Sequence, residues 1–424
     1  MNDSETRTIS AVPNQSKKKT LLIISQVYVP DPASVGQHMA DAAAEMARRG
    51  YRVVVLTANR GYEDPSVKYP SREVLDGVEV RRLPWSSFGK QSIAMRLLGG
   101  VLFMLQAIVR GVFTKGLAGM LISTSPPLCP VAAIVIRAVR RVPIAYWVMD
   151  LNPDQMIALG KISEKAMSAR LFNLLNRMIL KRSARVIALD RFMADRLIQK
   201  HPQVRNKLTV LPPWPHEDHL ETLNHEDNPF RGEHGWTDKF VIMFSGNLSI
   251  ASPVDTVLEA ALKLQDLPNV VFAFIGGGLG KKKVDQVIQE HAPPNIVSLP
   301  YQPLSRLRYS LSAADVHLVS MGDAIVGICH PCKVYGAMAV ARPILLLGPD
   351  PCHVSDILSD HEIGWHIRHG DVEGAIQTIR QMVTTPRASL QSMGEQAKET
   401  VADQLSKEKL CGAFCDAVEQ SMAR

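Results

Sequence analysis

The chain has 424 residues, which is too long for one compact core and predicts two domains. Its 46% hydrophobic content is typical of a globular protein, and its six cysteines are too sparse for a disulfide framework, which favours free thiols in a reducing cytoplasm. The net charge of +7 is uneven, because residues 1–215 hold 31 basic against 15 acidic side chains and the remainder holds 17 against 26. A basic first half favours an anionic partner, which leaves duplex nucleic acid, an anionic membrane surface and a phosphate-bearing acceptor as candidates.

The first half of the chain reads as alternating strands and helices. Residues 1–19 are polar and are expected to form a disordered tail. The run TLLIISQVYVP predicts a buried strand, followed by a loop with Gly36, a helix from His38 to Arg49 and the strand YRVVVLTA. This βαβ pattern is typical of a Rossmann-like domain. Further strands are expected at VEVRRLP, GMLISTS, PIAYWVMD, RVIALD and KLTVLP.

One apolar segment of this half raises the question of a membrane. The uncharged run Leu97–Val109 lies between Arg96 and Arg110 and is shorter than the roughly 20 residues that a spanning helix needs. Basic residues flank the wider stretch from Lys90 to Lys115, as they do in helices that lie in a membrane interface. An ordinary buried helix is the alternative interpretation of the same residues.

The α/β pattern begins again after a polar segment. Residues 215–238 are expected to be a linker, because they are rich in polar residues, Pro and Gly. Strands are then expected at KFVIMFSGN, VVFAFIGGG, NIVSLP, DVHLVSM and RPILLLG, with helices at Pro253–Leu267 and Lys281–His291. The tail from Ser389 onward is expected to be helical. Two successive α/β patterns predict two similar domains.

Ligands of parallel α/β sheets bind at the carboxyl ends of the strands. That rule selects five loops rich in Gly, Pro, Asp or Asn: Pro30–His38, Asp150–Asp154, Ser245–Ile250, Gly276–Lys283 and Cys329–Lys333. The glycines of the fourth loop have the wrong spacing for a P-loop, but the lysines that follow favour an anion at the helix start.

Metal chemistry finds little support in the sequence. Cys329 and Cys332 have the spacing of zinc and redox sites, yet only Cys352 and His353 lie near as further ligands, so we predict a helix start there. Asp-x-Asp occurs nowhere in the chain. We therefore expect no metal site, and we expect amides and basic side chains to bind any diphosphate.

The ordered motifs resemble family 4 glycosyltransferases, in particular the branch that builds bacterial O-antigen, capsule and colanic-acid polysaccharides. The resemblance covers roughly residues 20–420. It begins with Gln-x-Tyr-x-Pro-Asp after the first strand and Arg-Arg-Gly-Tyr before the second. It continues at Thr124–Pro127, Asp150–Asp154, Phe244–Leu248, Pro331–Tyr335 and Arg342–Ile344.

The resemblance implies a GT-B architecture, with two Rossmann-like domains that face each other across a cleft. The acceptor domain would comprise residues 20–214 and the nucleotide-sugar domain residues 239–402, and the last helix, within 403–424, would cross back to the first domain. The resemblance also implies retention of the anomeric configuration and no required metal.

The sequence departs from the family pattern at several positions. Ile328 and Gly336 stand where members usually carry two glutamates, and Met149 stands where a histidine commonly precedes the aspartate. Residues Ser249–Ser252 lack the Arg and Lys that many members have there. These departures put ribose contact and catalysis itself in question.

The predicted function is transfer of a sugar from a nucleotide sugar to a lipid-linked saccharide or other glycan in cell-surface polysaccharide biosynthesis. Expected partners are this donor, the acceptor and an anionic membrane surface, with no nucleic acid and no cofactor. A cytoplasmic protein, peripheral on the inner face of the cytoplasmic membrane, is expected. The candidate catalytic residues are Asp150, Lys333 and Lys281; the candidate donor-binding residues are Gly36, Gly246, Asn247, Gly276, Gly277, Pro331 and Lys333; the acceptor-side residues are His38 and Asp154. An epimerase of the same fold and an inactive scaffold are the alternatives.

Overall fold

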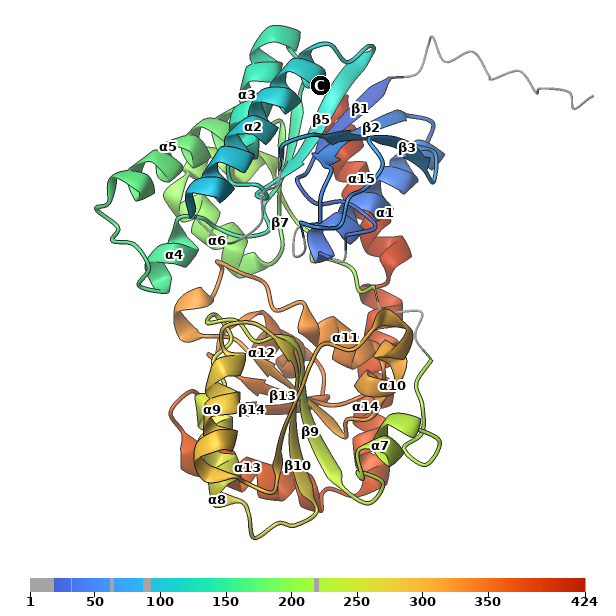
Figure 1. Ribbon diagram of the computed structural model, residues 1–424, viewed down its shortest axis with the longest axis vertical. Helices are drawn as coiled ribbons and strands as arrows, with labels where there is room; N and C mark the ends of the chain where they lie inside the picture. The colour runs from blue at the N-terminus through green and yellow to red at the C-terminus, as the bar shows by residue number, and fades with distance from the viewer. Residues whose placement is uncertain (1–18, 32, 62–64, 87–92, 217–220, 424) are drawn as a thin grey trace, which may run out of the picture. The chain divides into compact units, whose positions relative to one another are not determined.

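A computed structural model describes residues 19–31, 33–61, 65–86, 93–216 and 221–423 (Figure 1). The predicted disordered tail therefore lies almost entirely outside the described residues. The chain divides into two compact units, of which the first comprises Met1–Tyr146, Arg182–Ala184 and Val418–Arg424 and the second Trp147–Lys181 and Arg185–Ala417.

The N-terminal sheet has eight strands in the order β3-β4-β2-β1-β5-β6-β7-β8. They are β1 (Thr20–Ile24), β2 (Arg52–Ala58), β3 (Arg72–Leu75), β4 (Val78–Leu83), β5 (Leu117–Ser123), β6 (Ile144–Trp147), β7 (Arg185–Ala188) and β8 (Leu208–Val210). β3 pairs antiparallel with β4 at the edge, whereas β1, β2, β4 and β5 pair in parallel. The strand β1 is buried along its whole length, as expected for a central parallel strand.

The helices of this part of the chain are α1 (Ser34–Arg48), α2 (Ile93–Val112), α3 (Cys129–Arg140), α4 (Asp154–Ala158), α5 (Met167–Arg182) and α6 (Arg191–Lys200). The prediction that Gly36 lies in a loop and that the helix begins at His38 is wrong, because both residues lie inside α1. A Cβ on Gly36 would lie 3.1 Å from the Tyr28 backbone, so this glycine allows the helix to pack closely on the preceding loop.

The second sheet has six parallel strands in the order β11-β10-β9-β12-β13-β14. They are β9 (Phe240–Asn247), β10 (Val270–Gly277), β11 (Ile296–Leu299), β12 (Val316–Ser320), β13 (Ile344–Leu347) and β14 (Gly364–Ile367). The order reverses between β9 and β12, so this is the switch point at which such sheets bind ligands.

Helices cover both faces of this sheet (Figure 1). The helices in the rest of the chain are α7 (Pro229–Glu233), α8 (Asp255–Lys263), α9 (Lys281–His291), α10 (Leu307–Ser312), α11 (Lys333–Ala339), α12 (His353–Asp360), α13 (Val372–Thr384), α14 (Arg387–Gln404) and α15 (Lys407–Met422). Apolar residues of α8, α9 and α13 form the core on one face, and those of α11, α12 and α14 pack together on the other. The predicted linker contains α7, and its Phe230 and Trp236 are buried.

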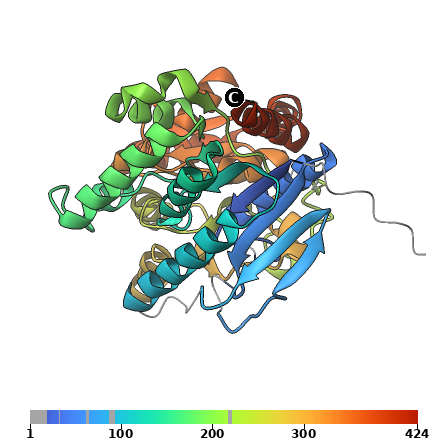
Figure 2. The same cartoon turned by 90° about the horizontal axis from the view of Figure 1, so that it is seen from above.

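The C-terminal tail forms two helices, and not the one expected, because the chain leaves helical geometry at Leu405 and Ser406 before α15 begins. From Val418 onward α15 belongs to the first unit, where Glu419 pairs with Arg49 at 2.7 Å and Met422 packs against Gly119. Figure 2 shows the end of this dark red helix beside the blue strands of that unit. The last helix thus returns to the N-terminal unit, as predicted. Each helix in the described ranges is too short or too polar to span a bilayer.

Candidate functional site

Two glycine turns meet at the switch point of the six-stranded sheet. Gly246 at the end of β9 has a φ of +124° and Gly276 in β10 has a φ of +140°, a conformation that other residues rarely adopt. A Cβ on Gly276 would lie 1.9 Å from the Gly246 carbonyl oxygen, so no side chain fits there. The Leu248 amide donates to the Gly277 carbonyl and the Gly280 amide donates to the Leu248 carbonyl, both at 2.7 Å. The two turns therefore pack backbone against backbone, and neither Gly246 nor Gly276 could carry a side chain there.

Lys333 lies directly against these turns. A Cβ on Gly246 would lie 2.8 Å from the Lys333 Cε, and the Lys333 Nζ lies 5.2 Å from the centre of the Phe244 ring. Within the described ranges no carboxylate forms an ion pair with this ammonium group, and burial lowers its pKa. A confined cation that lacks a carboxylate partner in the described ranges, and that lies beside glycine backbone, suits a bound anion.

The other candidates around the donor loops divide into two groups. Asn247 belongs to the same turns, since a Cβ on Gly278 would lie 2.2 Å from its Oδ1, while Gly277 packs against the Tyr301 ring. Lys281 instead pairs with Asp285 at 3.0 Å and contacts the Ser298 hydroxyl. Its charge is thus already compensated inside the protein.

The predicted loops around Asp150 and Pro331 are joined in the structure. The Leu151 amide donates to the Ile328 carbonyl at 3.0 Å, and Gln155 donates to the Cys329 thiol at 2.9 Å. Burial raises the pKa of Asp150, although a hydrogen bond with Cys329 opposes this shift. These contacts place Asp150 beside the segment that leads into Pro331 and Lys333.

Asp154, predicted on the acceptor side, has another set of partners. Its carboxylate is nearly buried and pairs with Lys200 at 2.7 Å and with Arg196 at 3.2 Å. These ion pairs connect α4 to α6. Any role of Asp154 in acceptor binding would require exchange of these partners.

A buried chain of polar side chains was not foreseen from the sequence. His330 Nδ1 lies 2.8 Å from Asp190 Oδ2, its Nε2 lies 2.7 Å from the Tyr335 hydroxyl, and that hydroxyl lies 2.9 Å from His353 Nε2. Burial lowers the pKa of His353 to about 3. Burial acts to raise the pKa of Asp190, but the hydrogen bond and charge of His330 and the Met193 amide together lower it. This series of hydrogen-bonded side chains fixes the loop that carries Pro331 and Lys333.

The sequence indicated some of the residues in this hydrogen-bonded series, but not their contacts. His330 and Tyr335 lie within the stretch that resembles the family signature, and Asp190 directly follows a predicted strand. Nothing in the spacing indicated that these residues would meet, because the partners are 140 residues apart.

Gly36 and His38, predicted for donor and acceptor contact, lie in the first unit at the start of α1. The Gly36 amide donates to the Ala33 carbonyl at 2.8 Å, so it is already engaged in the turn. His38 is buried, with its Nδ1 2.8 Å from the Ser34 carbonyl oxygen. Both residues act in the packing of α1.

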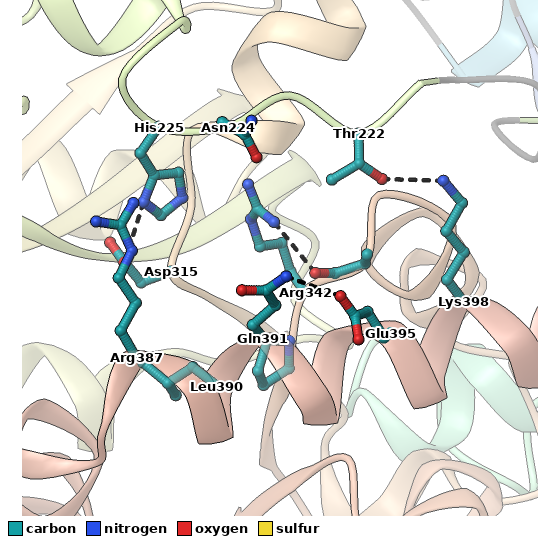
Figure 3. Close-up of a pocket in the computed structure, with 12 residues that line it drawn as sticks. Thr222, Asn224, His225, Asp315, Arg342, Arg387, Leu390, Gln391, Glu395 and Lys398 are labelled. Atoms are coloured by element: carbon teal, nitrogen blue, oxygen red, sulfur yellow. Dashed lines mark hydrogen bonds and ion pairs between the residues drawn. The ribbon is translucent and has the colours of Figure 1, made fainter.

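Two pockets of the second unit offer alternatives to the glycine turns. One, of about 390 Å³, lies at the same sheet edge, but Asp255, Glu259 and Asp323 line it and would repel a diphosphate. The other, of about 320 Å³, lies at the amino edge, where Asp315 precedes β12 and Arg342 precedes β13 (Figure 3). Parallel sheets bind ligands at the opposite edge.

Possible metal ligands are scattered in the part of the chain that the structure describes. No group of three or more His, Cys, Asp or Glu residues there is arranged to hold a metal ion. Metal independence remains a prediction.

Comparison with known proteins gives a consistent result. Residues 34–214 match the glycosyl transferase 4-like domain and residues 226–400 match the glycosyl transferases group 1 family. The chain is 24% identical over 377 residues to WbjE of Pseudomonas aeruginosa, named a probable glycosyltransferase, covering 87% of this chain and 91% of WbjE. It is 22% identical over 381 residues to WcaI of Escherichia coli (strain K12), named a colanic acid biosynthesis glycosyl transferase, covering 87% and 93%.

A solved structure with the same fold is HepE from Anabaena, determined in complex with UDP-glucose. It has a TM-score of 0.68 at 14% identity, and the match covers 94% of this chain and 99% of HepE. At this identity the likeness shows the fold alone.

Proposed function

Because the chain belongs to the family 4-like glycosyltransferases of polysaccharide biosynthesis, we propose that it moves a sugar from a nucleoside diphosphate sugar to a lipid-linked saccharide or other glycan, with retention of configuration. The bond between the anomeric carbon and the diphosphate breaks, a bond to an acceptor oxygen forms, and the acceptor hydroxyl passes its proton to the departing diphosphate. Negative charge grows on the departing diphosphate.

The observation that carries the proposal is Lys333 against the glycine turns. The surface of Gly246, Asn247, Gly276 and Gly277 lets a diphosphate approach the backbone, and the Lys333 ammonium supplies the opposite charge. Because this cation is already positioned before the reaction, it stabilises the leaving group without reorganisation. Asp150, held beside the same loop by the Cys329 contacts, positions the acceptor hydroxyl in this proposal.

The proposed donor class agrees with the ligand of HepE, which binds UDP-glucose. We propose that the reaction needs neither a cofactor nor a metal, since Lys333 neutralises the charge that a divalent cation would otherwise neutralise. Thermal unfolding in the presence of a panel of nucleotide sugars tests the site. The correct donor raises Tm by mass action in the wild type, also with excess EDTA, and not in Lys333→Met.

Each failure of this experiment has a distinct meaning. Stabilisation that disappears with EDTA and returns with Mg²⁺ contradicts the metal-free site. Stabilisation by no nucleotide sugar favours the inactive scaffold, to which the missing glutamates at Ile328 and Gly336 point. Release of a free epimerised sugar without any acceptor favours the epimerase.

We also propose that an anionic membrane surface, on the inner face of the cytoplasmic membrane, presents the acceptor. No acidic residue occurs between Glu79 and Asp150, whereas nine basic residues do. In α2, Phe103 and Ala107 are buried, while an opposite stripe exposes Met95, Leu98, Leu105 and Val109. Apolar side chains with basic neighbours are the pattern of a helix that lies in a membrane interface.

Vesicle sedimentation tests this surface. The protein is expected to bind phosphatidylglycerol vesicles at low salt and to be released as salt rises, because screening weakens surface charge. Leu105→Gln with Val109→Gln reduces binding. Wild-type protein that ignores these vesicles at low salt contradicts the membrane proposal and leaves the donor site unaffected.

A further inference from the structure

The first unit has a pocket of its own, at the carboxyl ends of β2 and β4, with binding groups that the proposed function does not use. Its volume is about 410 Å³. It is lined by Asn59, Arg60, Pro65, Lys68, Pro84, Trp85 and Met95. Asn59 and Arg60 directly follow β2, and Pro84 and Trp85 directly follow β4, so this pocket occupies the edge at which parallel sheets bind ligands.

Trp85, which lines this pocket, has an unfavourable backbone conformation and an exposed side chain. Its side chain is 69% exposed, and its φ of +54° lies in the left-handed region that bulky residues avoid. The turn is held from several sides, since Gln106 donates to the Pro84 carbonyl at 2.6 Å and Gln26 donates to the Ser86 carbonyl at 3.0 Å. Strain of this kind, fixed by surrounding bonds, is typical of functional positions. An exposed indole ring is a stacking surface for the apolar face of a sugar ring.

The polar groups around Trp85 are suited to a phosphorylated sugar. Asn59 lines the pocket, and its buried Oδ1 has an unused capacity to accept a hydrogen bond within the described ranges. Arg60 donates to the Pro65 carbonyl at 2.8 Å, but neither Arg60 nor Lys68 forms an ion pair with a described residue. Two cations that form no ion pair with a described residue, beside an aromatic platform, favour an anionic ligand.

We propose that this pocket binds the sugar diphosphate end of the acceptor. The sugar ring stacks on Trp85, one of its hydroxyls donates to Asn59, and Arg60 and Lys68 bind the phosphates. Met95 lines the pocket and also begins the exposed apolar stripe of α2, so an apolar chain attached to the diphosphate continues along that helix. This assignment rests on the proposed glycosyl transfer, and it identifies the acceptor as a lipid diphosphate-linked saccharide.

Acrylamide quenching of tryptophan fluorescence tests binding directly, without any transfer reaction. The other tryptophans Trp147, Trp214 and Trp236 are buried and Trp365 is half-buried, so Trp85 dominates the accessible signal. Farnesyl diphosphate-linked N-acetylglucosamine is the probe. It is expected to protect wild-type protein from the quencher, and Trp85→Phe is expected to lose most of the accessible signal.

Affinity for the probe, measured by calorimetry, is expected to fall about tenfold in Trp85→Ala and in Arg60→Gln, and to be unchanged in Val74→Ala, which alters an exposed apolar residue outside the pocket. Trp85→Gly suits the positive φ and replaces the alanine variant if that one fails to fold. Unchanged quenching on addition of the probe, or equal affinity in all these variants, overturns the assignment.

Transfer assays then separate this assignment from the proposed function. Normal transfer to the probe by Trp85→Ala and Arg60→Gln shows that the acceptor binds elsewhere and leaves the function intact. Protection of Trp85 by the probe, together with no transfer from any nucleotide sugar by the wild type, leaves the pocket intact and overturns the function.

Discussion

Each edge of the six-stranded sheet holds a cation with a pKa lowered by burial. The cation at the amino edge is bound within the protein, whereas the one at the carboxyl edge is available to a ligand. At the amino edge, Arg342 donates to the carbonyl oxygens of Leu223, Ser312, Ala314 and Ala341 at 2.7–3.2 Å, and burial lowers its pKa to about 10. At the carboxyl edge, Lys333 rests on Gly246 and lacks a carboxylate partner in the described ranges.

The difference teaches that neither a pocket nor a buried charge identifies a binding site by itself. The amino-edge pocket is well formed, but its groups bind one another: Lys398 donates to Thr222 at 3.1 Å and His225 lies 3.4 Å from Asp315 (Figure 3). These bonds anchor residues 222–225 to α14 and to the residue before β12. The carboxyl edge leaves its cation available, and availability is what an incoming anion requires.

The largest expected effect concerns the anchor. Arg342→Met removes four hydrogen bonds and leaves buried carbonyl oxygens without a donor, which is expected to cost about 3 kcal/mol or more of unfolding free energy. Urea denaturation measures the loss, and turnover per folded molecule is expected to stay close to wild type. Arg387→Gln is the matched control in the same pocket, because Arg387 is exposed and its ion-pair partner among the described residues is the exposed Glu226. Wild-type stability of Arg342→Met would show that the anchor contributes little.

Lys333→Met is expected to have the opposite effect, a loss of turnover with little loss of stability. Loss of a positioned charge that stabilises the leaving group is expected to lower single-turnover transfer by about 100-fold, or roughly 2.7 kcal/mol in the barrier. Stability is expected to change by less than about 1 kcal/mol, because no ion pair is broken. Near-normal turnover in a folded variant would mean that the diphosphate binds elsewhere.

The sequence predicts the strands and loops on which this comparison rests, but not the residues that contact one another there. The long apolar runs predicted the buried strands, and the carboxyl-edge rule selected the loops of Gly246, Gly276 and Lys333. The sequence does not predict the short edge strand β3, because Val74 follows two charged residues and no apolar run marks the strand. In the structure Val74 is accordingly 70% exposed. Pairing in three dimensions has no signature in a single sequence.

The same limit applies to the residues that complete each site. Arg342 was noted only as part of a motif, since its carbonyl partners are fixed by the packing of distant loops. Trp85 has no signature in the sequence, because one aromatic residue after a strand forms no pattern. Its importance depends on its backbone conformation and on the neighbours that Asn59 and Arg60 supply.

The amino edge should also respond to acid. Burial lowers the pKa of His225 to about 4, so the folded state binds this proton more weakly than the unfolded chain does. The stability that the neutral ring contributes is fully present above about pH 6.5 and is lost as the pH falls toward 4. Unfolding free energies of wild type and His225→Gln across this range measure the difference. Parallel pH curves for the two proteins would contradict this assignment.

The smallest expected effect is at Lys281, which lies near the same carboxyl edge as Lys333 but is paired. Its ammonium group already contacts Asp285 and Ser298, so approach of a diphosphate adds little attraction, and the neighbouring carboxylate opposes it. Lys281→Gln is therefore expected to change single-turnover transfer by less than about threefold, since only a compensated surface charge is lost. Asp285→Asn provides the matched test, because it frees the lysine without moving it: if Lys281 were able to assist, this variant would bind the donor more tightly than the wild type. A loss of transfer in Lys281→Gln as large as that in Lys333→Met would show that the leaving group draws on both lysines, and that the pairing seen here opens when the donor binds.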